Sequence, residues 1–85
     1  MVLFRYRNAD GDVGYRTVAP YIIYETFDGV VYLEGIDVVR EAWRRFTIEN
    51  VVHATVTREA FKPDKTFSPS MSRYTHVDCV VDLTN

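Results

Sequence analysis

The chain has 85 residues, of which 47% are hydrophobic and 14% aromatic, and ten Lys or Arg against twelve Asp or Glu give it a formal net charge of −2. This length allows one domain with a modest core, and the near-neutral charge excludes nucleic-acid binding driven by bulk charge. Since Cys79 is the only cysteine, and the sequence has neither a leader peptide nor an apolar run of membrane-spanning length, we expect a cytoplasmic protein without an intrachain disulfide or a membrane contact.

The N-terminal half of the chain alternates between β-prone runs and turn residues. We expect each run to form a strand, over residues 2–7, 13–19, 21–25 and 30–37. Asn8–Asp12 reads as a turn centred on Asp10-Gly11, and Asp28-Gly29 supports a second tight hairpin. Pro20 is expected to end the second strand, because proline has no N–H to donate to a strand ladder.

Residues 37–46 permit two interpretations. Their apolar residues have helical spacing, and Asp37 would cap a short helix. In the alternative, the chain turns near residues 39–41 and returns as a strand over 42–48. That strand would place Arg44 with Phe46 on one face and Arg45 on the other. The local pattern leaves both interpretations open.

The C-terminal half begins with a turn at Glu49-Asn50 and a β-prone run over 51–57, in which Val52, Ala54 and Val56 are expected to face the core. Residues 62–72 contain two prolines and three serines, which indicates a loop or arm. Residues 73–83 alternate in polarity like a half-buried strand. This strand either closes the sheet or pairs with another copy of the chain. We expect a homo-oligomer that forms through this C-terminal strand.

The sequence contains no recognisable catalytic or metal-binding motif. His53 and His76 lack Cys or acidic partners at metal-ligand spacing, and four scattered glycines form no phosphate-binding loop. We therefore expect neither an enzyme nor a cofactor. Eight of the ten basic residues are Arg, which is suited to bidentate phosphate contacts and to stacking.

The order of motifs along residues 2–61 resembles that of the WYL domain, whose members bind nucleic acid or nucleotide-like ligands in regulatory proteins. The matching segments are Tyr15-Arg16-Thr17-Val18-Ala19-Pro20, Val31-Tyr32-Leu33, Arg44-Arg45-Phe46, Ile48-Glu49-Asn50-Val51 and Thr57-Arg58-Glu59-Ala60-Phe61. Val31 stands where the family has its signature tryptophan, and Asn50 stands where it has an arginine.

The resemblance implies a mainly β fold, a small, strongly bent Sm-like or SH3-like barrel of about five strands. This barrel would occupy residues 1–61, followed by the arm over 62–72 and by a C-terminal strand over 73–85. The resemblance also favours the hairpin for residues 37–46. Since the helix-turn-helix domain found in most members does not fit before Val2, we expect a stand-alone domain.

The resemblance further implies a ligand groove. Arg16, Tyr32 and Arg44 match its positions, and Tyr24 and Arg45 are added because they lie close by in local spacing. Two guanidinium groups and a tyrosine suit a phosphate and a stacked base. The first hypothesis is therefore a regulatory module, without enzymatic activity, that binds single-stranded nucleic acid or a nucleotide.

The second hypothesis is a protein-interaction module, an adaptor or inhibitor encoded by a mobile element, that binds no small ligand. The near-neutral charge and the strand-forming C-terminal segment support it. The two hypotheses differ in what a structure would show. Convergence of Arg16, Arg44 and Tyr32 on one concave surface favours the first, whereas arginines on separate faces favour the second.

Overall fold

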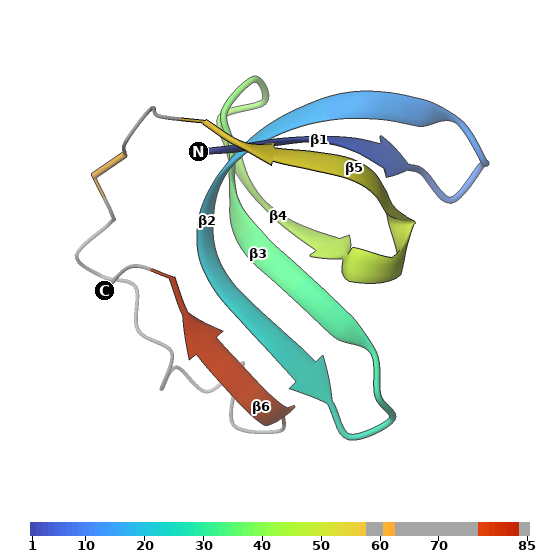
Figure 1. The fold of residues 1–85 in the computed structure, drawn as a ribbon, viewed down its shortest axis with the longest axis vertical. Helices are drawn as coiled ribbons and strands as arrows, with labels where there is room; N and C mark the ends of the chain where they lie inside the picture. Colours follow the sequence, from blue (N-terminus) through green and yellow to red (C-terminus); the bar gives the residue numbers. More distant parts are fainter. Residues whose placement is uncertain (58–60, 63–76, 84–85) are drawn as a thin grey trace.

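The computed structural model describes residues 1–57, 61–62 and 77–83. They form one antiparallel sheet with the strand order β4-β3-β2-β1-β5, and β6 lies beside β2 (Figure 1). The strands are β1 (Val2–Arg7), β2 (Val13–Thr26), β3 (Val31–Asp37), β4 (Ala42–Thr47), β5 (Val51–Val56) and β6 (Val77–Asp82), and a 3₁₀ helix, η1 (Ile48–Asn50), joins β4 to β5. Among the described residues, no helix has the length and apolar character needed to cross a membrane.

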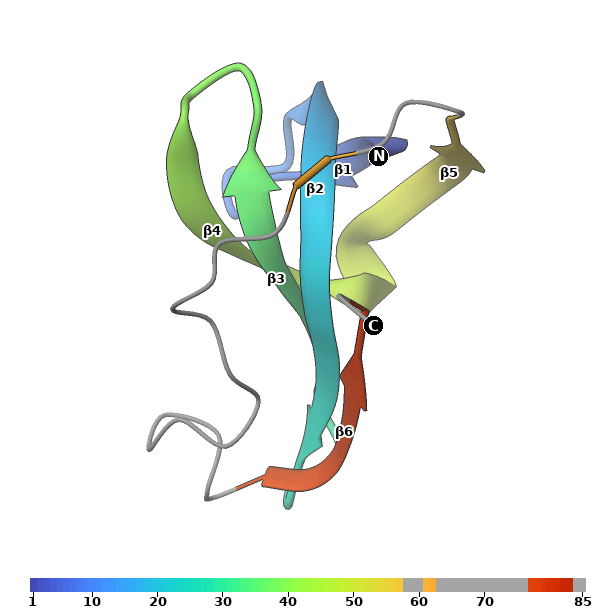
Figure 2. The same cartoon turned by 90° about the vertical axis from the view of Figure 1, so that its left-hand side faces the viewer.

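The sheet is strongly bent along β2, which is by far its longest strand (Figures 1 and 2). The first part of β2 pairs with β1, its last part pairs with β6 on the same edge, and β3 occupies the other edge. The predicted mainly β, strongly bent sheet of five strands with an added C-terminal strand is confirmed. Within the described residues, strand pairing ends at β4 and β5, so the sheet is not closed into a barrel.

The C-terminal strand of the described chain pairs with β2 of the same chain, and the amide of Leu83 continues this ladder by donating to the carbonyl of Tyr21 at 2.8 Å. The predicted strand over 73–83 extends further than β6, and residues 73–76 lie outside the described residues. Apart from Lys62, the predicted arm over 62–72 also lies outside them.

Pro20 does not end its strand, which corrects the prediction. β2 continues to Thr26, with a shift of register between Pro20 and Ile22. Pairing with β1 has already ended at Val18, so no donor is needed from Pro20 on that edge. Its partner on β3 is Gly35, where an added Cβ would lie only 2.1 Å from the carbonyl oxygen of Ala19. The register shift between Pro20 and Ile22 therefore lets β2 bend and still continue as one strand.

Both predicted N-terminal turns are present. Gly11 and Gly29 adopt φ angles of +90° and +87°, the left-handed region that glycine enters without steric cost. Residues 37–46 form the hairpin rather than the helix, with Asp37 paired to Ala42. Asp37 is completely buried and accepts a hydrogen bond from the amide of Arg40 at 3.1 Å, which stabilises the turn.

The main core lies on the concave side of the sheet. Its fully buried side chains come from four different strands, and they are Phe4, Val18, Leu33 and Phe46. The rings of Phe4 and Phe46 meet edge to face at 5.2 Å, and the Tyr6 ring meets Phe46 at 5.1 Å. The Tyr6 hydroxyl also accepts a hydrogen bond from the Thr47 amide at 2.9 Å, which holds the end of β4 against β1.

The predicted core face of β5 is only partly right: Ala54 and Val56 pair with Phe4 and Val2 and share their core side, but they are exposed, and Val52 lies at the register shift. Val52 and Val56 are 44% and 80% exposed, whereas Val51, expected to face away, packs against the core. The pairing with β1 shifts between Arg5 and Tyr6, so regular alternation does not hold through the start of β5. The rest of the strand lies at the margin of the sheet, beyond the reach of the core.

Candidate functional site

Three of the five predicted site residues come together on the convex face of β2, β3 and β4. Tyr24 and Tyr32 are directly paired, and their ring centroids lie 5.5 Å apart. The guanidinium carbon of Arg45 lies 4.4 Å above the centroid of the Tyr32 ring, a cation–π contact. Arg45 is exposed and Tyr32 is half-buried, so this pair borders solvent.

A buried carboxylate organises this aromatic cluster. Glu34 is 6% exposed, and it accepts hydrogen bonds from the Tyr24 hydroxyl and from Nε1 of Trp43, the latter at 2.7 Å. Tyr21 packs against Trp43 at 5.0 Å between ring centroids. The sequence reasoning missed Glu34, although an acidic residue inside an apolar strand is itself a signal of a buried polar contact.

The environment of Tyr24 changes its acidity. Burial raises the pKa of the Tyr24 hydroxyl well above its usual range. The hydrogen bond to Glu34 and the negative charge of that carboxylate raise the pKa further, while the Arg45 guanidinium lowers it in part. Tyr24 therefore remains a neutral hydrogen-bond donor at every physiological pH.

We expect the free energy of unfolding to fall as the pH rises above about 10, the ordinary tyrosine pKa. The folded-state pKa of Tyr24 is raised, so its contribution is complete below that pH and is lost as the pH increases toward the folded value. Tyr24→Phe should remove up to about 1.4 kcal/mol of this loss per pH unit. Urea unfolding between about pH 8 and 11.5 measures it, with Tyr15→Phe as the exposed control. An unchanged slope in Tyr24→Phe would contradict this account.

The other two predicted residues lie on the concave side. Arg44 pairs with Gly35 and shares its face of β4 with Phe46, opposite Arg45. Arg16 pairs with Phe4, and it too points to the core side. Arg16, Arg44 and Tyr32 therefore do not converge on one surface, and the groove expected from these three residues is not assembled.

Arg16 is a buried structural arginine, only 7% exposed. Its Nη1 donates to the carbonyl of Tyr15 at 2.9 Å, and its Nη2 donates to Oδ1 of Asn8 at 2.8 Å. Its Nε has no hydrogen-bond partner among the described residues. Gly14 leaves room for the guanidinium, because a Cβ there would lie 2.7 Å from Nη1. Arg16 thus stabilises the β1–β2 hairpin from the core side of the sheet, through its hydrogen bonds to Tyr15 and Asn8.

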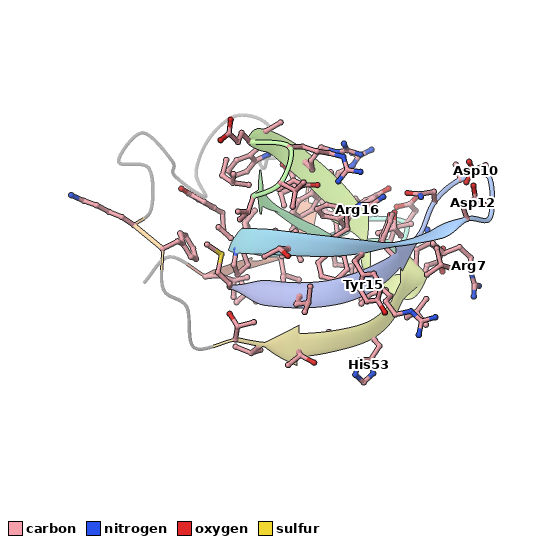
Figure 3. All side chains as sticks on the ribbon, turned by 90° about the horizontal axis from the view of Figure 1, so that it is seen from above. Arg7, Asp10, Asp12, Tyr15, Arg16 and His53 are labelled. Carbon is pink, nitrogen blue, oxygen red and sulfur yellow. The ribbon has the colours of Figure 1, made fainter. Side chains whose placement is uncertain are left out.

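An exposed basic and aromatic row lies on the outer face of the same hairpin. Arg5 on β1 pairs with Tyr15 on β2 and with His53 on β5. Directly paired residues project from the same face of a sheet, so these side chains form a line, the Tyr15–Arg5–His53 row. Figure 3 labels its two ends, Tyr15 and His53. All three are exposed, Tyr15 by 72%. Arg7, also exposed, extends the same face of β1.

The row borders a shallow hollow of about 190 Å³. Among the described residues, the hollow is lined by Leu3, Phe4, Arg5, Tyr15, His53 and Thr55, without a carboxylate. Asp10 and Asp12 lie at the tip of the β1–β2 turn (Figure 3), where Oδ1 of Asp10 accepts a hydrogen bond from the Asp12 amide at 3.1 Å. The hollow therefore combines the Arg5 guanidinium, the His53 imidazole, aromatic side chains and apolar contacts.

The sequence contained half of the information needed to find this row. A hairpin centred on Asp10 pairs Arg5 with Tyr15, so that contact follows from the predicted turn. His53 reaches the row through the pairing of β1 with β5, between segments far apart in the sequence. No local sequence pattern predicts the pairing of β1 with β5.

The described residues thus define a small β domain built on one open, strongly bent antiparallel sheet. The family model of the WYL domain matches residues 1–56, more than half of the 85-residue chain. The chain therefore belongs to the WYL domain family, as the motif order predicted. No curated protein and no solved structure matches the chain.

Proposed function

We propose that this WYL domain is a regulatory module, without enzymatic activity, that binds single-stranded nucleic acid or a nucleotide. The observation that carries the proposal is the exposed Tyr15–Arg5–His53 row beside an acid-free hollow. The tyrosine ring offers a stacking surface for a base, and Arg5 with Arg7 offers bidentate donors for phosphates. The lone Cys79 supports a reducing, cytoplasmic setting.

The row is preferred over the predicted groove because its groups are accessible. Arg16 is buried and engaged by Asn8, and the Tyr24 hydroxyl is engaged by Glu34. Arg45 above Tyr32 offers similar chemistry on the convex face, and it is the part of the predicted groove that remains a second candidate. The two surfaces differ in residues, so substitution distinguishes them.

Binding of a fluorescent single-stranded oligonucleotide, followed by anisotropy at two salt concentrations, tests the proposal. Tyr15→Ala should weaken binding about tenfold or more, since base stacking contributes roughly 1–3 kcal/mol. Arg5→Ala combined with Arg7→Ala should weaken it further and reduce the slope of log K against log salt by about 0.7 for each lost phosphate contact. An unlabelled nucleotide as competitor shows whether one base and its phosphates suffice.

Arg44→Ala and Arg45→Ala provide matched controls, because each removes an exposed arginine from another part of the sheet. Both should retain binding. If Arg45→Ala abolishes binding while the Arg5 and Arg7 variant retains it, the ligand lies on the Tyr32 surface instead. Absence of binding at low salt would reject nucleic-acid recognition by this domain.

A protein-interaction module remains the second candidate function, and one observation favours it. β5 is exposed after Val51 and contains no Lys, Arg, Asp or Glu, and the edge of such a strand is a template for another strand.

A further inference from the structure

Within the described residues, three strands have a free edge, and they differ in charge. β4 pairs with β3, β5 with β1, and β6 with β2, each along one side. The sequence of β4 contains Arg44 and Arg45, and that of β6 contains Asp78 and Asp82. Charged residues on an edge strand discourage pairing with other chains. β5 reads Val-Val-His-Ala-Thr-Val and contains no Lys, Arg, Asp or Glu, so it lacks this protection.

The edge of β5 is also accessible and regular over most of its length. Every residue of β5 after Val51 is exposed, and Val56 is 80% exposed. The shift of register with β1 falls at Val52, so the regular part begins at His53. It continues past the strand to Thr57, whose amide donates to the carbonyl of Met1 at 3.0 Å. Among the described residues, no strand pairs with the outer side of this five-residue run, 53–57.

We infer that β5 pairs with β5 of a second copy of this chain, antiparallel and centred on Thr55. The regular run 53–57 has Thr55 at its midpoint, so this register uses the whole run. It places Thr55 opposite its own copy and Ala54 opposite Val56. Threonine pairs stabilise antiparallel strands, and the Ala54–Val56 pairs place no like charges opposite each other. A two-fold axis through Thr55 makes the interface self-complementary, the commonest arrangement of soluble oligomers.

The dimer extends the outer face on which the Tyr15–Arg5–His53 row lies. A two-fold axis perpendicular to the sheet keeps the outer faces of both copies on the same side. The two rows then lie on one continuous surface with His53 near the junction. The dimer itself rests on the β5 edge and does not require that the row binds nucleic acid.

Sedimentation velocity of the full chain from about 10 µM to about 1 mM tests the inference, because a small interface is expected to associate weakly. The mass should rise from one chain of 9.9 kDa toward two chains as concentration increases. Thr55→Lys places two ammonium groups opposite each other and should keep the chain monomeric throughout. Val56→Lys, at a highly exposed position, is a second variant if Thr55→Lys fails to fold.

Ala42→Lys makes the same kind of change on the exposed edge of β4 and should leave the dimer intact. Thr55→Cys in a Cys79→Ser background should form a disulfide-linked dimer faster than Val39→Cys, an exposed turn position, because opposed Cα atoms lie within disulfide reach. A monomer at all concentrations would overturn the inference. Loss of association in Ala42→Lys would overturn it as well, because β4 would then be the interface. These masses are read without nucleic acid, so they are independent of the binding experiment.

Discussion

Gly35→Ala should unfold the domain or destabilise it by at least about 3 kcal/mol. The new Cβ would lie 2.1 Å from the carbonyl oxygen of Ala19 and 3.1 Å from Cα of Pro20. Both neighbours are backbone atoms of the central strand, so no side-chain rotation relieves the contact. Separation of β2 from β3 is the remaining response, and it would disrupt the most extensive pairing in the sheet.

Gly29→Ala is the matched control for this prediction. Gly29 has a φ angle of +87°, but an added Cβ would meet no atom within 4 Å. Its cost is therefore the conformational one, roughly 1–2 kcal/mol. Urea unfolding followed by circular dichroism compares the two variants. The close approach of the strands would be disproved by a Gly35→Ala protein as stable as Gly29→Ala.

Phe46→Ala should cost about 3–5 kcal/mol of unfolding free energy, the range for deleting a buried phenylalanine. Phe46 is 1% exposed and contacts the rings of Phe4 and Tyr6 at 5.2 and 5.1 Å. Its removal leaves a cavity where β4 meets β1. Since a domain of this length has a total stability of roughly 4–13 kcal/mol, this loss would remove a large share of it.

Phe27→Ala removes the same side chain from the β2–β3 turn, where Phe27 is 73% exposed. It should change stability by less than about 0.5 kcal/mol. Phe46→Leu should fall between the two, because it fills part of the cavity. The melting temperature and the urea midpoint of the three variants measure this order. Equal effects of Phe46→Ala and Phe27→Ala would mean that Phe46 is not a core residue.

Most of the fold was predictable because its signals are local. The turns at Asp10-Gly11 and Asp28-Gly29 set the pairing of β1 with β2 and of β2 with β3. The order of motifs then identified the WYL domain and resolved residues 37–46 as a hairpin. The course of β2 beyond Pro20 was not predictable, because proline is tolerated there only through the register shift and the opposing Gly35.

The candidate site was harder to predict because burial and strand pairing over long distances decide it. Arg16 looked like a ligand-binding arginine. Neighbouring residues of a strand face opposite sides of the sheet, so Tyr15 lies on the outer face and Arg16 points toward the core. Glu34 was not among the predicted site residues, yet Tyr24 and Trp43 on the convex face donate hydrogen bonds to its buried carboxylate. His53 acquires its neighbours from β1, which no local pattern indicates.

The register shift in β2 has a consequence for how the domain tolerates sequence change. Before the shift, even-numbered residues such as Val18 face the concave core, whereas after it Ile23 faces that core and Tyr24 faces the convex cluster. One strand thus serves two apolar layers, with its alternation reversed in phase between them. A family pattern written with a single period across this strand would misassign one of its halves. The number of residues at the bend therefore matters as much as their chemistry, because it sets which side chains of the second half face each layer.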